Sequence, residues 1–195
     1  MIINLTKIPS FWLTCDKTAS RWPRMEEILK QLEIPAQKVN GRLSNPYTLA
    51  VAESHLQCLK STPGPVLIIE DDVEIMPGYR DIVEVPDDTA ALYIGTSQYG
   101  INFRETRLGG VVCKEEGDHL RIFNMLSMHA ILYLSEDYKN HVIGLLESFK
   151  PGLGVDQMIA EEMCNWKVLA VKSPMFYQND GWSREATETP LHPIF

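Results

Sequence analysis

The sequence predicts a single α/β domain, in which a mostly parallel central sheet is flanked by helices and carries a small antiparallel annex. Over about the first hundred residues, short aliphatic segments alternate with amphipathic segments, an order typical of parallel strands joined by crossover helices. The middle of the chain adds a hairpin pattern, which predicts the annex. No repeat, low-complexity block or linker divides the sequence, so we expect one domain over residues 1–195.

The first part of the chain predicts three strands and two helices. Residues 1–5 are mostly β-branched or aliphatic, which favours a buried strand. In the first helical segment apolar residues recur at three- and four-residue spacing, Ser20 suits the N-cap, and Pro23 is tolerated in the first turn. The predicted elements are strands at 1–5, 35–41 and 66–70 and helices at 18–34 and 44–61.

The later part of the chain predicts three strands, two helices and a hairpin. Residues 76–88 indicate turn, short helix or coil, and the hairpin turns at Glu116-Gly117-Asp118. Ser135 suits the N-cap of a helix whose first turn is acidic, as the helix macrodipole favours. The predicted elements are strands at 90–95, 129–135 and 167–174, helices at 136–149 and 155–166, and a polar tail at 175–195.

Charge and composition exclude several classes of function. Eighteen basic and twenty-six acidic residues give a net charge of −8, which lacks the basic field that nucleic acids and anionic membranes require. No apolar run approaches the roughly 20 residues of a membrane span, and no signal peptide is evident. The four cysteines are scattered, which indicates reduced thiols. We therefore expect a cytoplasmic protein that binds no nucleic acid and has no membrane span.

Three adjacent acids, Glu70, Asp71 and Asp72, follow the aliphatic segment VLII. Ligands of open α/β sheets bind outside the carboxyl ends of strands, and the three acids lie at such an end. With a period of two, Glu70 and Asp72 point to one side and Asp71 to the other. Carboxylates that converge repel each other unless a cation separates them, and Mg²⁺ or Mn²⁺ with a diphosphate would do so. The alternative is an acidic turn exposed to solvent.

Further segments, taken with these acids, resemble glycosyltransferase family 25, the lipopolysaccharide and collagen galactosyltransferase-type enzymes. In chain order they read INL, RWPRM, KVNG, ESHLQCL and VLIIEDDVEI, followed more loosely by LYIG, HAILYLS, GVDQM and SPMFYQNDGWS. The resemblance covers roughly Ile2 to Ser183. The chain departs from the family pattern at Asn40, where the family often has Asp, and at Val51, where it often has Cys.

The resemblance implies a GT-A-like (Rossmann-like) fold, a nucleotide-sugar donor that is most often UDP-galactose, and a divalent metal, Mn²⁺ or Mg²⁺. It also implies transfer of a hexose, with inversion, to a glycan, lipopolysaccharide or glycoprotein acceptor. A metal on both phosphates stabilises the departing nucleoside diphosphate. We interpret Asp72 as a metal ligand, Glu70 as lying on the metal or ribose side, and Asp71 as a donor-binding residue or a brace of the loop.

Inversion also requires a base that takes the proton of the acceptor hydroxyl. Asp156 in GVDQM is the candidate, because it follows a glycine-rich turn, opens a helix, and falls where the resemblance places an Asp. The alternative is an ordinary N-cap residue, with the glycines only making the turn.

The remaining candidates concern donor binding, and each has a structural alternative. Arg21 and Arg24 suit phosphate oxygens, whereas an exposed helix face explains them almost as well. His55 matches the family's Ser-His, but a lone helical His is more often a packed residue. Aromatic residues near the end of the chain either stack on a sugar or pack in the core. The donor-binding candidates are Asn4, Leu5, Arg21, Arg24, Ser54, His55, Glu70, Asp71 and Gln178; Gln178, Asp180 and His192 are candidates for a late metal ligand; and Trp166, Tyr177 and Trp182 are the aromatic candidates.

The sequence therefore predicts a metal-dependent, inverting glycosyltransferase. A non-catalytic module of the same fold that binds a nucleotide sugar or a glycan is the alternative. A phosphohydrolase with an aspartyl nucleophile is disfavoured, because EDDVE does not supply the DxDx(T/V) pattern.

Overall fold

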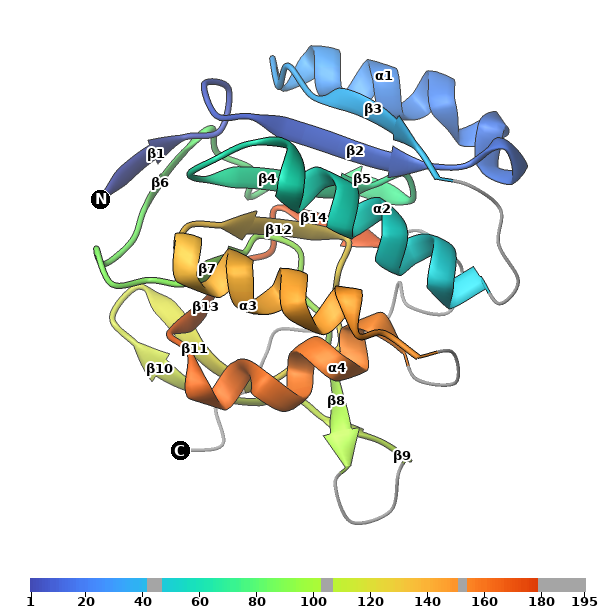
Figure 1. The fold of residues 1–195 in the computed structure, drawn as a ribbon. Helices are drawn as coiled ribbons and strands as arrows, with labels where there is room; N and C mark the ends of the chain where they lie inside the picture. Colours follow the sequence, from blue (N-terminus) through green and yellow to red (C-terminus); the bar gives the residue numbers. More distant parts are fainter. Residues whose placement is uncertain (42–46, 103–106, 151–153, 179–195) are drawn as a thin grey trace.

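The computed structural model describes residues 1–41, 47–102, 107–150 and 154–178 (Figure 1). Its main feature is an eight-stranded sheet in the order β10-β11-β13-β7-β12-β4-β2-β3, which confirms the α/β class. The strands of this sheet are β2 (Ser10–Thr14), β3 (Gln37–Asn40), β4 (Val66–Glu70), β7 (Ala91–Tyr93), β10 (Val112–Glu116), β11 (His119–Asn124), β12 (Ala130–Tyr133) and β13 (Val168–Val171).

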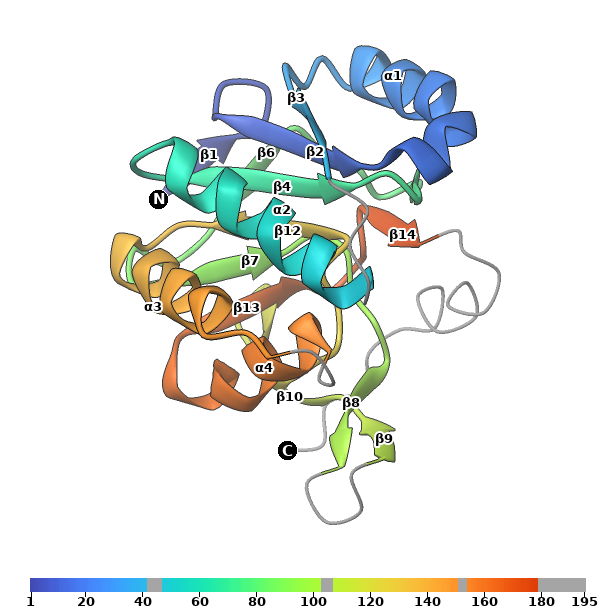
Figure 2. The same ribbon diagram turned by 45° about the vertical axis from the view of Figure 1, so that its right-hand side comes forward.

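Helices flank the sheet on both faces (Figures 1 and 2). One hydrophobic core lies between the sheet and α2, α3 and α4, and a second core lies between the opposite face and α1 with two short ribbons. None of the helices among the described residues is both long and apolar enough to cross a membrane. The helices are α1 (Trp22–Gln31), α2 (Tyr47–Ser61), α3 (Glu136–Glu147) and α4 (Val155–Glu162), with 3-10 turns η1 (Asp16–Arg21) and η2 (Met163–Asn165).

A parallel unit of β2, β3 and β4 fixes where a ligand can bind. β2 pairs in parallel with both other strands, with Leu13 opposite Val39 on one side and Glu70 on the other. The chain leaves β2 through α1 on one face of the sheet and reaches β4 through α2 on the opposite face. The strand order therefore reverses between β2 and β4. In open α/β sheets this switch point opens a crevice at the carboxyl ends of the strands, where ligands bind.

The sheet is mixed, so the prediction of a mostly parallel sheet is wrong. β12 runs antiparallel to both β4 and β7, and β11 runs antiparallel to both β10 and β13. The β10–β11 hairpin turns at Gly117, which has a φ of 60°, as the sequence predicts. Antiparallel neighbours need no crossover helix. The helix–strand alternation of the first part of the chain therefore does not continue through the middle.

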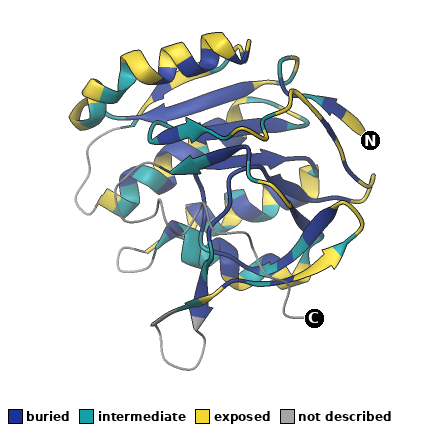
Figure 3. Cartoon of the chain, turned by 180° about the vertical axis from the view of Figure 1, so that it is seen from behind, coloured by how far each residue is buried: buried dark blue, intermediate teal, exposed yellow. Residues whose placement is uncertain are grey.

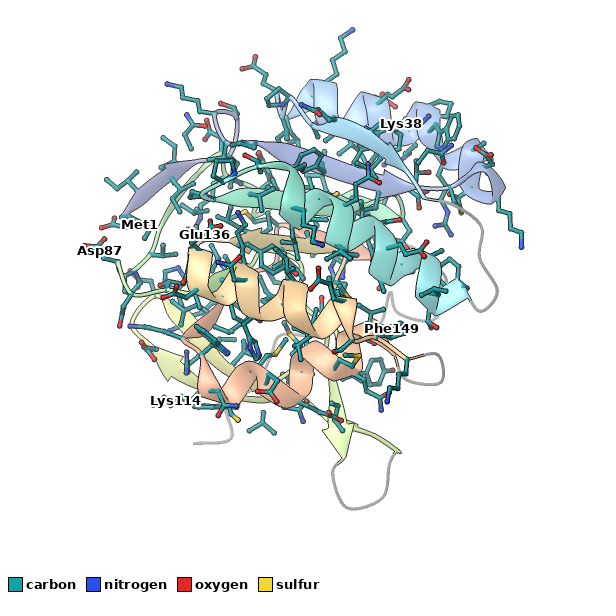
Figure 4. The ribbon with its side chains drawn as sticks, viewed as in Figure 1. Met1, Lys38, Asp87, Lys114, Glu136 and Phe149 are labelled. Carbon is teal, nitrogen blue, oxygen red and sulfur yellow. The ribbon has the colours of Figure 1, made fainter. Side chains whose placement is uncertain are left out.

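Three two-stranded antiparallel ribbons lie outside the main sheet and confirm a small antiparallel annex, although the hairpin that predicted it, β10–β11, belongs to the main sheet. They are β1 (Ile2–Asn4) with β6 (Ile82–Glu84), β5 (Val73–Ile75) with β14 (Phe176–Gln178), and β8 (Tyr99–Asn102) with β9 (Arg107–Gly110). Seen from behind, buried positions run through the main sheet, while the β1–β6 ribbon has both buried and exposed positions (Figure 3). The ammonium group of Met1 lies 2.6 Å from Asp87 Oδ1 at the end of the first ribbon (Figure 4).

Two local predictions for the first part of the chain need correction. Residues 1–5 form an outer ribbon strand, and the main sheet begins instead with β2, which the sequence analysis assigned to no element. β2 is an inner strand, next to the edge strand β3, and it is buried on both faces because Phe11 and Leu13 enter one core while Trp12 enters the other. The first helix is capped at Arg21 rather than Ser20, because a 3-10 turn precedes it.

Candidate functional site

Three carboxylates, which we call the acidic corner (Glu70, Asp71 and Asp72), lie at the switch point between β2 and β4. β4 ends at Glu70, and the two aspartates form the turn that leads into β5. The ends of β2 and β4 lie side by side, with β14 close to them (Figure 2). The sequence therefore predicted correctly that the acids follow a buried strand at the carboxyl edge of the sheet.

Asp71 is fully occupied by donors from the neighbouring strand and turn. Its Oδ2 accepts hydrogen bonds from the hydroxyls of Thr14 and Thr18, and its Oδ1 accepts one from Arg21 Nη1 at 3.0 Å. Trp22 Nε1 donates to Thr14 at 2.6 Å, which fixes the threonine in turn. Asp71 therefore braces the end of β4 against the first turn of the 3-10 helix.

Asp72 is also buried, but it is only half satisfied. Its Oδ2 accepts a hydrogen bond from Gln178 Nε2 at 3.0 Å and lies 3.7 Å from Arg21 Nη1. Its Oδ1 is buried without a hydrogen-bond partner among the described residues. Burial raises the pKa of Asp72 to about 7, and the charge of Glu70 adds to that effect, although Gln178 and Arg21 oppose it. Asp72 therefore carries an electrostatic cost that the protein alone does not remove.

Glu70 points toward helix α2, where His55 lies behind it. His55 is completely buried, with Nε2 at 3.5 Å from Glu70 Oε1. Burial lowers the pKa of His55 to about 3, so the ring is neutral near pH 7 and the contact is a weak hydrogen bond. Ser54, the other half of the predicted Ser-His pair, donates to Ala50 O at 2.8 Å within the helix.

An open cleft of about 460 Å³ adjoins the acidic corner. This volume lies within the range of small-molecule sites. Glu70 and Asp72 line it from the end of β4, Arg21 from the start of α1, and Asp156 from the first turn of α4. With Gln178 from β14, the cleft thus brings together five of the residues that the sequence singled out. Thr18, Tyr47 and Ser127 also line the cleft.

Asp156 lies at the second position of α4, and Gly154 rather than Asp156 is the N-cap residue. Its Oδ1 accepts a hydrogen bond from the backbone N–H of Gln157 at 2.9 Å. A Cβ atom on Gly154 would lie 2.4 Å from that oxygen, so the glycine leaves room for the carboxylate. Burial raises the pKa of Asp156, although hydrogen bonds from the backbone oppose the shift.

Several candidates do not reach the cleft. Leu5 is fully buried in the second core, and Asn4 accepts two hydrogen bonds from Thr6 at the end of the outer ribbon. Neither residue lines the cleft, because the first predicted strand is not part of the main sheet. Arg24 pairs instead with Glu74 on β5. Asp180, Trp182, Ser183 and His192 lie outside the described residues.

The sequence analysis missed four contributors to the site. Thr14 and Thr18 bind Asp71, Tyr47 lies exposed at the cleft, and Ser127 lies on its wall. For Thr14 a signal existed, because the apolar segment SFWLT ends in this threonine just as the segment VLII is followed by acids. For Ser127 nothing in the local sequence indicates that the chain before β12 returns to the acidic corner.

The arrangement of donors fits a hard divalent cation at Asp72 and Glu70. In the described part of the chain no group of three or more His, Cys, Asp or Glu residues is placed to hold a metal ion. A magnesium or manganese ion in a phosphate-binding site takes only one or two protein carboxylates, and water and phosphate oxygens complete its shell. The buried, unpartnered Asp72 Oδ1 beside the second carboxylate meets that requirement.

Comparison with known proteins gives likenesses of fold only. No protein family and no curated protein matches the sequence. The chain is similar to the inositol-1-phosphate CTP transferase from T. maritima, with 12% identity and a TM-score of 0.46 over 89% of this chain and 71% of that one. It is also similar to a UDP-glucose pyrophosphorylase complexed with UDP-glucose, with 11% identity and a TM-score of 0.47 over 89% and 75%. A nucleoside-diphosphate-sugar pyrophosphorylase from Vibrio cholerae RC9 has 10% identity and a TM-score of 0.47 over 86% and 73%. Likenesses at this level assign no activity to the chain.

Proposed function

We propose that this protein is a metal-assisted, inverting glycosyltransferase of the family 25 type, which transfers a hexose from a nucleotide diphosphate sugar to a glycan, lipopolysaccharide or glycoprotein acceptor. One observation carries the proposal: Asp72 Oδ1 is buried without a hydrogen-bond partner from the described residues, beside Glu70, in a cleft at the topological switch point. An unsatisfied buried acceptor costs free energy that a bound ligand can offset. The family resemblance makes UDP-galactose the first donor to test.

Asp72 and Glu70 would hold Mn²⁺ or Mg²⁺ in this proposal. The bound ion supplies positive charge that stabilises the departing nucleoside diphosphate. Gln178 holds Asp72 Oδ2 at 3.0 Å, which leaves Oδ1 for the cation. Arg21 remains anchored on Asp71 and is 39% exposed at the cleft, so the rest of its guanidinium group is free to contact phosphate oxygens.

Asp156 is the proposed base. It lines the same cleft from a different wall, the start of α4. Its Oδ1 is held by the Gln157 N–H, so Oδ2 takes the proton of the acceptor hydroxyl while that oxygen attacks the anomeric carbon. The raised pKa of Asp156 makes the carboxylate a stronger base than an exposed aspartate.

A non-catalytic module that binds a nucleotide sugar or a glycan is the second candidate. The observation that favours it is the local bonding of Asp156 to its own helical turn, which an aspartate with a purely structural role would also show. Such a module would keep the donor site at the acidic corner and lack turnover.

Thermal unfolding with UDP or GDP, each with and without Mn²⁺, tests the donor site. A metal-dependent rise of several degrees is expected with UDP, because a ligand that binds only the folded state stabilises it. No shift with any nucleotide would defeat both candidate functions. Slow Mn²⁺-dependent hydrolysis of a UDP-sugar, lost in Asp72→Ala, favours the enzyme over the module.

The base assignment has its own test. Asp156→Asn keeps the side-chain oxygen that caps the Gln157 N–H but removes the proton acceptor. We expect this variant to bind UDP and Mn²⁺ like the parent and to lose turnover by about a hundredfold or more. Transfer or hydrolysis at the parental rate would show that Asp156 is not the base.

A further inference from the structure

Ser127 is a buried serine on the cleft wall, and its hydroxyl contacts two neighbouring polar groups. It is 6% exposed and lines the cleft together with Asp72 and Asp156. We propose that Ser127 hydrogen-bonds a hydroxyl of the transferred sugar and so determines which hexose the protein accepts. This inference rests on the proposed function and adds the residue that recognises the sugar ring.

Ser127 lines the same cleft as the proposed metal site and the proposed base. β12 is the neighbour of β4, and the Glu70 N–H donates to His129 O at 2.9 Å, so the chain just before β12 lies beside the acidic corner. Helix α4, which carries Asp156, packs against β11, which lies beyond β12 from β4, and also against α2, α3 and β8. A donor with its diphosphate at Asp72 and its anomeric carbon near Asp156 has its sugar ring between these two groups, in the cleft that Ser127 lines.

The hydrogen bonds of Ser127 determine what its hydroxyl offers to the cleft. Oγ donates to Gly95 O at 3.2 Å and lies 3.2 Å from His129 Nδ1. With its proton on the Gly95 carbonyl, the hydroxyl accepts from the Nδ1–H of His129. A hydroxyl has one proton and two lone pairs, so one lone pair remains as an acceptor. Ser127 therefore suits a sugar hydroxyl that donates.

His129 is fixed in place, which keeps this acceptor oriented. The ring is 1% exposed, and a Cβ atom on Gly95 would lie 2.2 Å from its Nε2. The ring thus occupies the space that the missing side chain of Gly95 leaves. A rigid acceptor of this kind discriminates by position, because a donor sugar without a hydroxyl at the matching carbon leaves a buried polar group without a partner.

The test compares the affinities of UDP and UDP-galactose in the presence of Mn²⁺, because the sugar distinguishes the two ligands. If another sugar nucleotide binds the parent protein more tightly, it replaces UDP-galactose in this comparison. We expect Ser127→Ala to weaken binding of UDP-galactose about tenfold and to leave binding of UDP unchanged. Ser127→Thr keeps the hydroxyl and should recover most of the loss. Ser97→Ala is the matched control, because Ser97 is also buried, accepts from the Tyr99 N–H at 3.1 Å, and does not line the cleft.

Donors that lack a single sugar hydroxyl identify the one that Ser127 contacts. The parent protein should bind the donor that lacks the contacted hydroxyl about tenfold more weakly than the complete donor. Ser127→Ala should bind these two donors equally well. Equal weakening of UDP and UDP-galactose in Ser127→Ala would assign Ser127 a structural role and overturn the inference, as would no change in either. If the parent binds neither UDP nor any UDP-sugar, the proposed function itself fails, and the inference fails with it.

Discussion

Replacing Asp72 with asparagine should stabilise the metal-free protein at alkaline pH. The pKa of Asp72 is raised from 3.8 to about 7, chiefly by burial and then by the charge of Glu70. The folded state therefore holds this proton more tightly than the unfolded chain does. The contribution of Asp72 to stability is complete below pH 3.8 and is lost as the pH rises through about 7. The full loss corresponds to about 4 kcal/mol in the free energy of unfolding.

Urea-induced unfolding in EDTA, at about pH 8 and again at about pH 4, measures this cost. Asp72→Asn should gain up to about 4 kcal/mol at the higher pH and much less at the lower one, because the parent's carboxyl is already protonated there. Added Mn²⁺ should stabilise the parent and not the variant. A variant less stable than the parent at about pH 8 in EDTA would refute the claim that the Asp72 charge is an uncompensated cost.

The neighbouring Asp71→Asn is the control, and it should behave in the opposite way. Asp71 is buried to a similar degree, but it accepts hydrogen bonds from Thr14, Thr18 and Arg21. Removing its charge weakens bonds to a charged acceptor, so we expect a loss of about 2 kcal/mol at the higher pH. Opposite changes in the free energy of unfolding at these adjacent positions would distinguish a carboxylate that stabilises the fold from one whose charge needs a bound ligand.

Two further predictions concern stability. Lys139 is 1% exposed, and its Nζ donates to Thr62 O, Gly64 O and Glu136. Lys139→Met should therefore lower the free energy of unfolding in urea by about 3 kcal/mol without changing UDP binding. Unchanged stability would show that these bonds contribute nothing. Gly95→Ala should cost about 2 kcal/mol, because the new Cβ would meet the His129 ring. The control is Gly144→Ala in α3, where the new Cβ has no neighbour within 4 Å, and it should raise the free energy of unfolding by about 0.5 kcal/mol. Equal effects of the two substitutions would contradict the predicted clash.

The sequence predicted the elements whose local pattern matches their role. Helices α2 and α3 and strand β4 were recognised because their apolar spacing or aliphatic run is long enough to identify them. Ser135 caps α3 as predicted, with the Tyr138 N–H donating to its hydroxyl at 3.3 Å. Strand β2 was missed because SFWLT is a short apolar run whose place in the sheet depends on β3 and β4, which follow later in the chain.

The candidate site was predictable where it follows one segment and not where it joins distant segments. The three acids are adjacent in the sequence and directly follow an aliphatic run. Their position at the end of β4 could therefore be predicted once that run was recognised as a strand. Gln178 meets Asp72 across 106 residues of sequence through the β5–β14 ribbon, and the sequence analysis assigned neither strand. Ser127 lies at the cleft because β12, which follows it, runs antiparallel beside β4. The prediction of a mostly parallel sheet did not include this arrangement.

Burial alone does not distinguish the two aspartates of the acidic corner. Their side chains are 8% and 12% exposed, yet the oxygens of Asp71 have three donors and one oxygen of Asp72 has none among the described residues. The difference arises because the two carboxylates of this turn have different surroundings: Asp71 accepts from Thr14 at the end of β2 and from Thr18 in the 3-10 turn, whereas Asp72 lines the cleft. A carboxylate that only supports the fold gains most when every oxygen is satisfied. In the proposed function this incomplete shell is where the cation binds, and it is the physical reason for placing the donor diphosphate there.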